Sequence, residues 1–278
     1  MQGKLVERHS APAVNQLSMI VVVILLGYLL LPYLEIPVQQ ISLRLFGVEL
    51  LYVLQARTMV AFLLAGLAAV GTHWLLAEHP NYRGESLILY TILPTLTAWI
   101  LTVPLADLAF SARWWGLFFI GGALLMAVFT AEYISLDTRD KYYPFASMGL
   151  TALSFALYLF LAISLRAADI RLFTVSTTLA LAGFLIALRS LYLRLNAAWH
   201  PLWSLAIALV IAQIAAGMHY LPLSPIMFAI IMVALCYALV NVAEAVIRKE
   251  PLRRVWIETG VLAVIMLLIG FFINRFLP

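Results

Sequence analysis

The stretch SPIMFAIIMVALCYALVNVAEAVIRKEPLRR, residues 224–254, decides the fold class of this chain. Residues 224–246 form a mainly apolar run that is long enough to cross a bilayer as a helix, which takes about 20 residues. The segment 248–254 then follows at once and is rich in arginine and lysine. An apolar run of this length with a basic exit is typical of a transmembrane helix.

The composition of the whole chain agrees with that stretch. Of the 278 residues, 65% are hydrophobic and 11% are charged, and the mean hydropathy is +1.04. A soluble domain carries roughly 25% charged residues, so a soluble globule is excluded. Nine segments have the length and hydropathy of a span: 14–34, 57–77, 86–104, 114–134, 144–165, 172–192, 201–218, 224–246 and 255–276. We therefore predict an all-α polytopic integral membrane protein, a bundle of about nine transmembrane helices in a single domain over residues 1–278.

The basic residues predict the orientation. An arrangement that starts with the N-terminus inside places most of the 17 lysines and arginines on the inner side. The segment 248–254 is the strongest case, whereas the loop 218–224 on the opposite side has neither lysine nor arginine. By the positive-inside rule we predict a multi-pass protein of the cell membrane with a cytoplasmic N-terminus and the C-terminus outside.

One predicted outer segment, residues 38–54, has its own pattern. Apolar and polar residues alternate on both sides of Gly47, as in Ile41, Ser42 and Leu43. Alternation with period two around a glycine predicts a short β-hairpin. Ile41, Leu45 and Val48 also share helical spacing, so an interfacial amphipathic helix is the alternative. We favour the hairpin.

Two further patterns concern packing. Stripes of alanine at four-residue spacing, such as Ala123, Ala127 and Ala131, allow helices to approach closely. Alignment of Ala131-Glu132 with Ala243-Glu244 also places the second to fifth predicted spans over the sixth to ninth. This suggests a weak parallel repeat of residues 57–165 and 172–276, and such repeats are known from transporters.

Ionisable and amide side chains collect near the predicted inner boundary of four spans. They are Glu132, Arg189, Asn241, Glu244, Arg248, Arg254 and Glu258. Charged residues within spans usually face the bundle interior and pair with one another. The cluster is a candidate site for an anionic headgroup or a carboxylate-lined mouth, or else a girdle of salt bridges that holds the helix ends. Because these residues lie about one or two helical turns from the boundary, where burial costs little, we favour the girdle.

Two faces near the middle of the bilayer carry hydroxyl groups. The candidate cavity-lining residues are Thr91, Thr95, Thr102, Ser147, Thr151, Ser154 and Tyr158. Together with a kink expected at Pro94, they could border a cavity for a neutral or amphipathic ligand. Serine and threonine in spans more often bond to their own helix, and we favour that interpretation.

Motifs for known chemistry are missing from the sequence. The five histidines are dispersed without metal-ligand spacing, and no phosphate-binding glycine loop or nucleophile motif occurs. We predict no catalytic residue, no metal and no cofactor. The scattered basic residues exclude a nucleic-acid partner, so we expect membrane lipids, other membrane proteins or a second copy as partners.

These patterns favour a non-catalytic role, as a scaffold or accessory subunit of a membrane complex. The first alternative is a transporter or flippase-like carrier of an amphipathic or lipid substrate, with a path between the third and fifth spans. The second is an enzyme that acts on a lipid headgroup at the cytoplasmic face through Glu132, Asp137 or Glu244.

Overall fold

The computed structural model describes residues 14–33, 39–45, 48–54, 56–80, 82, 84, 86–108, 110–168, 170–195 and 198–251, and six positions between 257 and 268. Within these residues, eight helices are long and apolar enough to cross a membrane. The prediction of a polytopic helical protein is therefore confirmed at this level. The ninth predicted span, 255–276, falls outside the described residues except at those six positions, all of which are helical.

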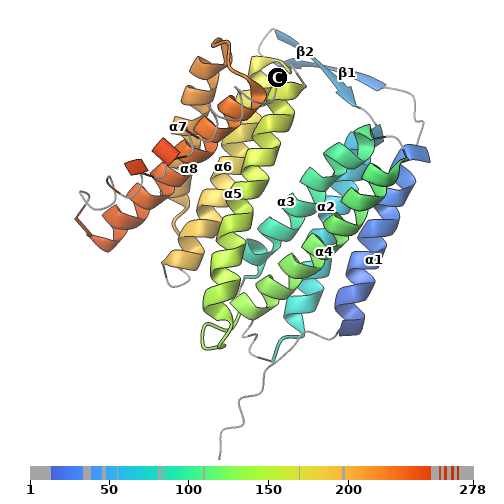
Figure 1. Cartoon of the computed structure of the whole chain (residues 1–278), viewed down its shortest axis with the longest axis vertical. Coiled ribbons are helices and arrows are strands. Elements are labelled where there is room, and N and C mark those ends of the chain that lie inside the picture. Colours follow the sequence, from blue (N-terminus) through green and yellow to red (C-terminus); the bar gives the residue numbers. More distant parts are fainter. Residues whose placement is uncertain are drawn as a thin grey trace, which may run out of the picture. The chain divides into compact units, whose positions relative to one another are not determined.

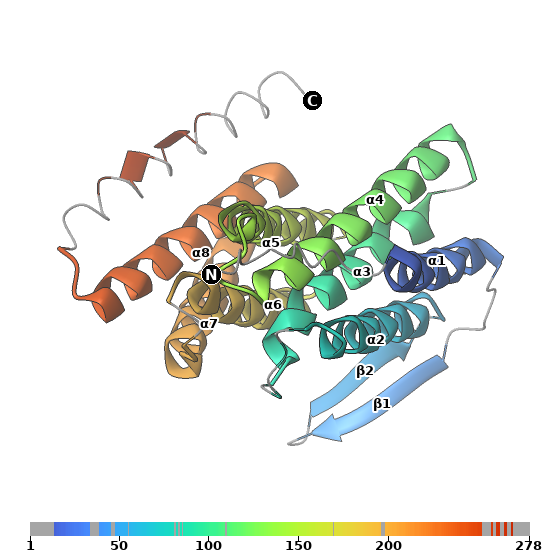
Figure 2. The same ribbon diagram turned by 90° about the horizontal axis from the view of Figure 1, so that it is seen from below.

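The chain divides into two compact units, residues 1–150 and 151–278. The first unit contains α1 (Val14–Leu30), the short 3-10 helix η1 (Leu31–Tyr33), α2 (Ala56–Ala77), α3 (Ile88–Asp107) and α4 (Ala112–Ser135). Helix α2 packs along α3, and α1 contacts both α2 and α4 (Figures 1 and 2). Helix α5 (Tyr143–Ala167) begins in the first unit and ends in the second.

The segment between α1 and α2 forms two strands. β1 (Gln39–Leu45) pairs antiparallel with β2 (Val48–Leu54), with Ile41 opposite Tyr52 and Leu45 opposite Val48. Of the two alternatives for residues 38–54, the structure therefore has the strand pair, and the alternation around Gly47 was the informative pattern.

Close helix packing in the first unit depends on glycine. A Cβ at Gly27 of α1 would lie 2.2 Å from the Cδ2 atom of Leu64 in α2, and one at Gly71 of α2 would lie 2.6 Å from the Cγ2 atom of Ile20. Leu64 and Ile20 are buried, so the two helices meet where the side chain is missing. Small residues have this role in membrane helices, because they let the backbones approach.

A second tie in the first unit joins α1 to α3. The buried Tyr28 hydroxyl donates to the carbonyl oxygen of Ala98 at 2.6 Å, and Thr102 donates to the same oxygen at 3.0 Å. At the turn between α3 and α4, the indole Nε1 of the buried Trp114 donates to the carbonyl of Leu105 at 3.0 Å. These aromatic side chains thus fill the core while their polar atoms find backbone partners.

The second unit contains α6 (Leu172–Arg194), α7 (Pro201–His219) and α8 (Pro225–Arg248), and α6 packs against both α7 and α8. Ser224 is the N-cap of α8, and its hydroxyl accepts from the backbone N–H of Met227. Pro225 occupies the first turn, where its missing N–H costs nothing. The helix ends at Arg248, and the cap residue Lys249 adopts the left-handed conformation with φ 56°.

The end of α8 is a Schellman motif. The N–H of Glu250 donates to the carbonyl of Ala245 at 2.9 Å, and that of Lys249 to the carbonyl of Val246 at 3.2 Å. Pro251 follows and cannot continue the helix. The chain therefore leaves α8 sharply just after Arg248, which positions that side chain at the helix end.

Candidate functional site

A polar network joins the C-terminal ends of α6 and α8 in the second unit. The Nη1 atom of Arg194 donates to Asn241 Oδ1 at 2.7 Å and to Glu244 Oε2 at 3.0 Å. Arg248, one helical turn beyond Glu244, pairs with Glu244 Oε1 at 3.0 Å and also donates to the carbonyl of Arg194. One carboxylate therefore holds two guanidinium groups from two helices.

The network is only partly shielded from solvent. The side chains of Arg194 and Glu244 are 19% and 21% exposed, and that of Arg248 is 43% exposed. The Arg194 guanidinium also lies 5.8 Å above the ring centre of Tyr237, one turn before Asn241 on α8. Asn241, Glu244 and Arg248 follow one another at spacings of three and four residues and so lie on one face of α8.

A cavity of about 420 Å³ lies beside the network. Its lining comes from the end of α6, the connection to α7 and the end of α8: Arg194, Leu195, Ala198, His200, Ile247 and Arg248. Three of these side chains carry N–H donors, and none carries a carboxylate. His200 is the N-cap residue of α7, but its side chain makes no capping hydrogen bond in the described structure.

The remaining members of the predicted charged cluster lie elsewhere. Glu132 is fully buried in α4 of the first unit, where Ser135 Oγ donates to its Oε2 at 3.2 Å. Arg189 is fully buried in α6 of the second unit, with its guanidinium 5.6 Å from the ring centre of Tyr192. Arg254 and Glu258 fall outside the described residues. Asn241, Glu244 and Arg248 are the predicted members that come together around Arg194.

Three of the seven predicted hydroxyl residues bond to nearby backbone. The hydroxyls of Thr91, Thr102 and Ser154 each donate to a carbonyl three or four residues earlier in the same helix, at 2.8, 3.0 and 2.8 Å. Tyr158 instead donates to the carbonyl of Leu179 at 3.3 Å and so ties α5 to α6. The bonds of Thr91, Thr102 and Ser154 are of the within-helix kind that the sequence analysis favoured.

Three further residues of the predicted cavity complete the set. Thr95 lies one residue after Pro94 in α3, and its buried hydroxyl has no hydrogen-bond partner among the described residues. Ser147 lies in the part of α5 that belongs to the first unit, and Thr151 lies at the start of the second. The carrier path between α3 and α5 stays a prediction.

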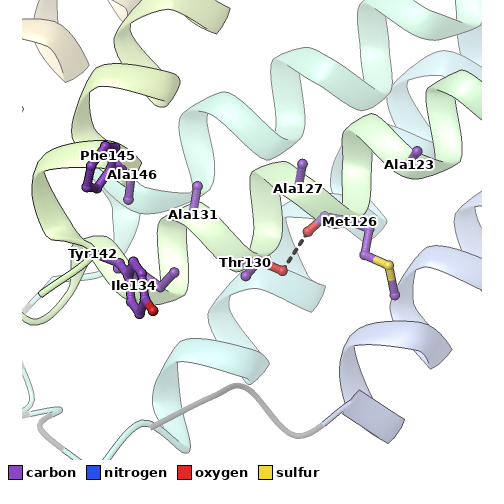
Figure 3. Close-up of a pocket in the computed structure, with 9 residues that line it drawn as sticks. All are labelled: Ala123, Met126, Ala127, Thr130, Ala131, Ile134, Tyr142, Phe145 and Ala146. Atoms are coloured by element: carbon purple, nitrogen blue, oxygen red, sulfur yellow. Dashed lines mark hydrogen bonds between the residues drawn. The ribbon is translucent and has the colours of Figure 1, made fainter. Parts of the chain in front are cut away.

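A second cavity, of about 530 Å³, is an apolar groove on α4 and the start of α5 in the first unit (Figure 3). It is lined by Ala123, Met126, Ala127, Thr130, Ala131, Ile134, Tyr142, Phe145 and Ala146. The alanine stripe of the fourth predicted span thus lies along this groove. The Thr130 hydroxyl bonds back to the carbonyl of Met126 at 2.8 Å, so the groove floor presents mainly methyl and methylene groups.

A buried histidine lies just after α2, outside the membrane-spanning helices. The ring centres of His79 and Tyr133 are 4.4 Å apart in an edge-to-face arrangement. Burial lowers the pKa of His79 below its ordinary value, and the negative charges of Asp137 and Asp140 oppose this shift in part. Among the described residues, no three histidine, cysteine, aspartate or glutamate side chains gather into a set that could hold a metal ion.

Sequence reasoning did not include Arg194 or His200 in the candidate site. In the sequence, Arg194 is one of 17 lysines and arginines, and His200 is one of five dispersed histidines. A usable signal did exist, because both residues flank the short connection between α6 and α7 at the same predicted side as Arg248. That they line one cavity with Arg248 follows only from the packing of α6 on α8.

Eight apolar helices of membrane length indicate a polytopic helical membrane protein. Residues 36–273 match a family described as "Protein of unknown function (DUF5656)", and the chain belongs to that family. No curated protein and no solved structure matches the chain.

Proposed function

We propose that this protein is a non-catalytic scaffold or accessory subunit of a membrane complex, and that the apolar groove on α4 receives a transmembrane helix of a partner protein. The observation that carries the proposal is the lining of the groove. Ala123, Ala127 and Ala131 line it one turn apart along α4, and Phe145 lines it from the start of α5 (Figure 3).

A surface lined by small residues can bind a transmembrane helix, because helices in lipid associate through close packing. Lipid tails are as apolar as leucine, so association depends on close van der Waals contact rather than on the hydrophobic effect. Small residues at four-residue spacing allow that contact. From Ala123 to Ile134 the groove follows α4 for roughly 16 Å, which is about three helical turns.

Filling the groove tests the proposal. In Ala127→Leu the larger side chain projects from the middle of the floor and keeps a partner helix at a distance. The matched control is Gly116→Leu on the same helix, because a side chain at Gly116 meets no atom within 4 Å and Gly116 does not line the groove. Both variants add an exposed leucine to α4, so a general effect of hydrophobicity affects both alike.

The measurement is purification of the full chain from its native membrane in a mild detergent, followed by mass spectrometry of the proteins and lipids that copurify. We expect a stoichiometric membrane protein with the wild type and with Gly116→Leu, and its loss with Ala127→Leu. If a lipid and no protein is lost with Ala127→Leu, the groove holds an acyl chain and the scaffold proposal is wrong. A protein partner that survives Ala127→Leu also contradicts it.

A further inference from the structure

The cavity at the ends of α6 and α8 has the chemistry of an anion site. Two guanidinium groups and one imidazole line it, and the lining includes no carboxylate. Guanidinium groups match the geometry of phosphate oxygens, because their N–H groups form a rigid planar fork. The bonds from Arg194 to Asn241 and Glu244 both use Nη1, which is one of three nitrogens in that group. A guanidinium anchored through one nitrogen is pre-positioned for an anion.

The start of the neighbouring helix α7 acts in the same direction. Helix α7 begins at Pro201, directly after His200, so the positive end of its dipole lies at the cavity side.

We infer that this cavity binds a phosphate-bearing anion through Arg194, His200 and Arg248. The cavity lies where α6 and α8 end and α7 begins, which is the level of lipid headgroups for helices that span a bilayer. A phospholipid headgroup and free phosphate present the same group to these donors. The inference is independent of the groove on α4, which belongs to the other unit.

Titration of the purified full chain in neutral detergent tests the site. The probes are inorganic phosphate, short-chain phosphatidic acid and, as the zwitterionic comparison, short-chain phosphatidylcholine, all at constant ionic strength. We expect the wild type to bind one or both of the first two in preference to phosphatidylcholine. Binding of phosphatidic acid alone identifies a lipid headgroup as the source, and binding of inorganic phosphate alone identifies a soluble anion.

Arg248→Gln and His200→Gln remove donors from the cavity. A hydrogen bond to a charged group contributes enough that Arg248→Gln should weaken binding by about tenfold or more, with a smaller effect from His200→Gln. The matched control is Lys249→Gln, which removes the same charge from an adjacent exposed residue outside the cavity lining. It should leave the dissociation constant nearly unchanged, because Lys249 is exposed and salt screens its charge.

Glu244→Gln distinguishes an anion site from a purely structural girdle. Glu244 competes for both guanidinium groups, so its neutralisation should strengthen binding of the phosphate probe while it lowers thermal stability. If the arginines only fix the helix ends, the same variant loses stability and gains no affinity. The inference is overturned by that result, by wild-type affinity in Arg248→Gln, or by no preference for phosphate and phosphatidic acid in the wild type.

Discussion

At the scale of single residues, His79 is the described ionisable group outside the spans whose burial should affect stability. Its ring packs on Tyr133, and burial lowers its pKa even though Asp137 and Asp140 oppose the shift. The unfolded chain therefore binds a proton at His79 more readily than the folded chain does. The contribution of neutral His79 to the free energy of unfolding is fully present above the unfolded pKa of about 6.5. It is lost as the pH drops through the lower pKa of the folded state.

The corresponding prediction concerns His79→Gln. Thermal unfolding of the wild type between neutral and mildly acidic pH should show a falling Tm, and the variant should lose less Tm over the same range. His73→Gln is the control, because His73 is an exposed histidine six residues earlier on α2 and should keep the wild-type pH dependence. An equal decline in the wild type and in His79→Gln would show that carboxylates elsewhere cause the acid sensitivity.

At the scale of secondary-structure elements, adding one methyl group where α1 contacts α2 should destabilise the protein. In Gly27→Ala the new Cβ would lie 2.2 Å from the buried Leu64 side chain, so the helices must shift or Leu64 must change rotamer. Overpacking of this kind costs about 1–3 kcal/mol. The expected result is a Tm lowered by several degrees, measured on the detergent-solubilised protein.

Gly66→Ala on α2 is the control for helix propensity. A Cβ at Gly66 meets no atom within 4 Å, and alanine is a better helix former than glycine by about 0.5–1 kcal/mol. Its Tm should stay level or rise. If Gly27→Ala behaves like Gly66→Ala, the close approach of the two helices does not limit stability.

At the scale of the whole molecule, the predicted orientation can be tested with cysteine labelling. Cys236 is the one cysteine of the chain and is fully buried in α8, so the wild type should resist a membrane-impermeant maleimide. Arg139→Cys, between α4 and α5, should react only after the cells are lysed. Tyr220→Cys, in the exposed turn between α7 and α8, should react in intact cells, because the two loops are predicted on opposite sides. The reverse pattern would place the N-terminus outside.

The sequence by itself determined the class of the protein and the positions of its helices. The predicted span 57–77 corresponds to Ala56–Ala77, 114–134 to Ala112–Ser135, and 224–246 to Pro225–Arg248. Span position could be predicted because hydropathy and length are local properties of consecutive residues. The alternation around Gly47 is local for the same reason.

Only the tertiary structure decided which polar groups meet. Arg194 binds Asn241 and Glu244, which are 47 and 50 residues away in the chain. That contact depends on the rotation of α6 and α8 about their axes and on the distance between them. Both follow from the packing of many residues throughout the unit. One example is Gly183 of α6, where the missing side chain leaves room for Ile211 of α7. Spacing along one helix predicts which residues share a face, but the residue opposite that face is known only once the helices are packed.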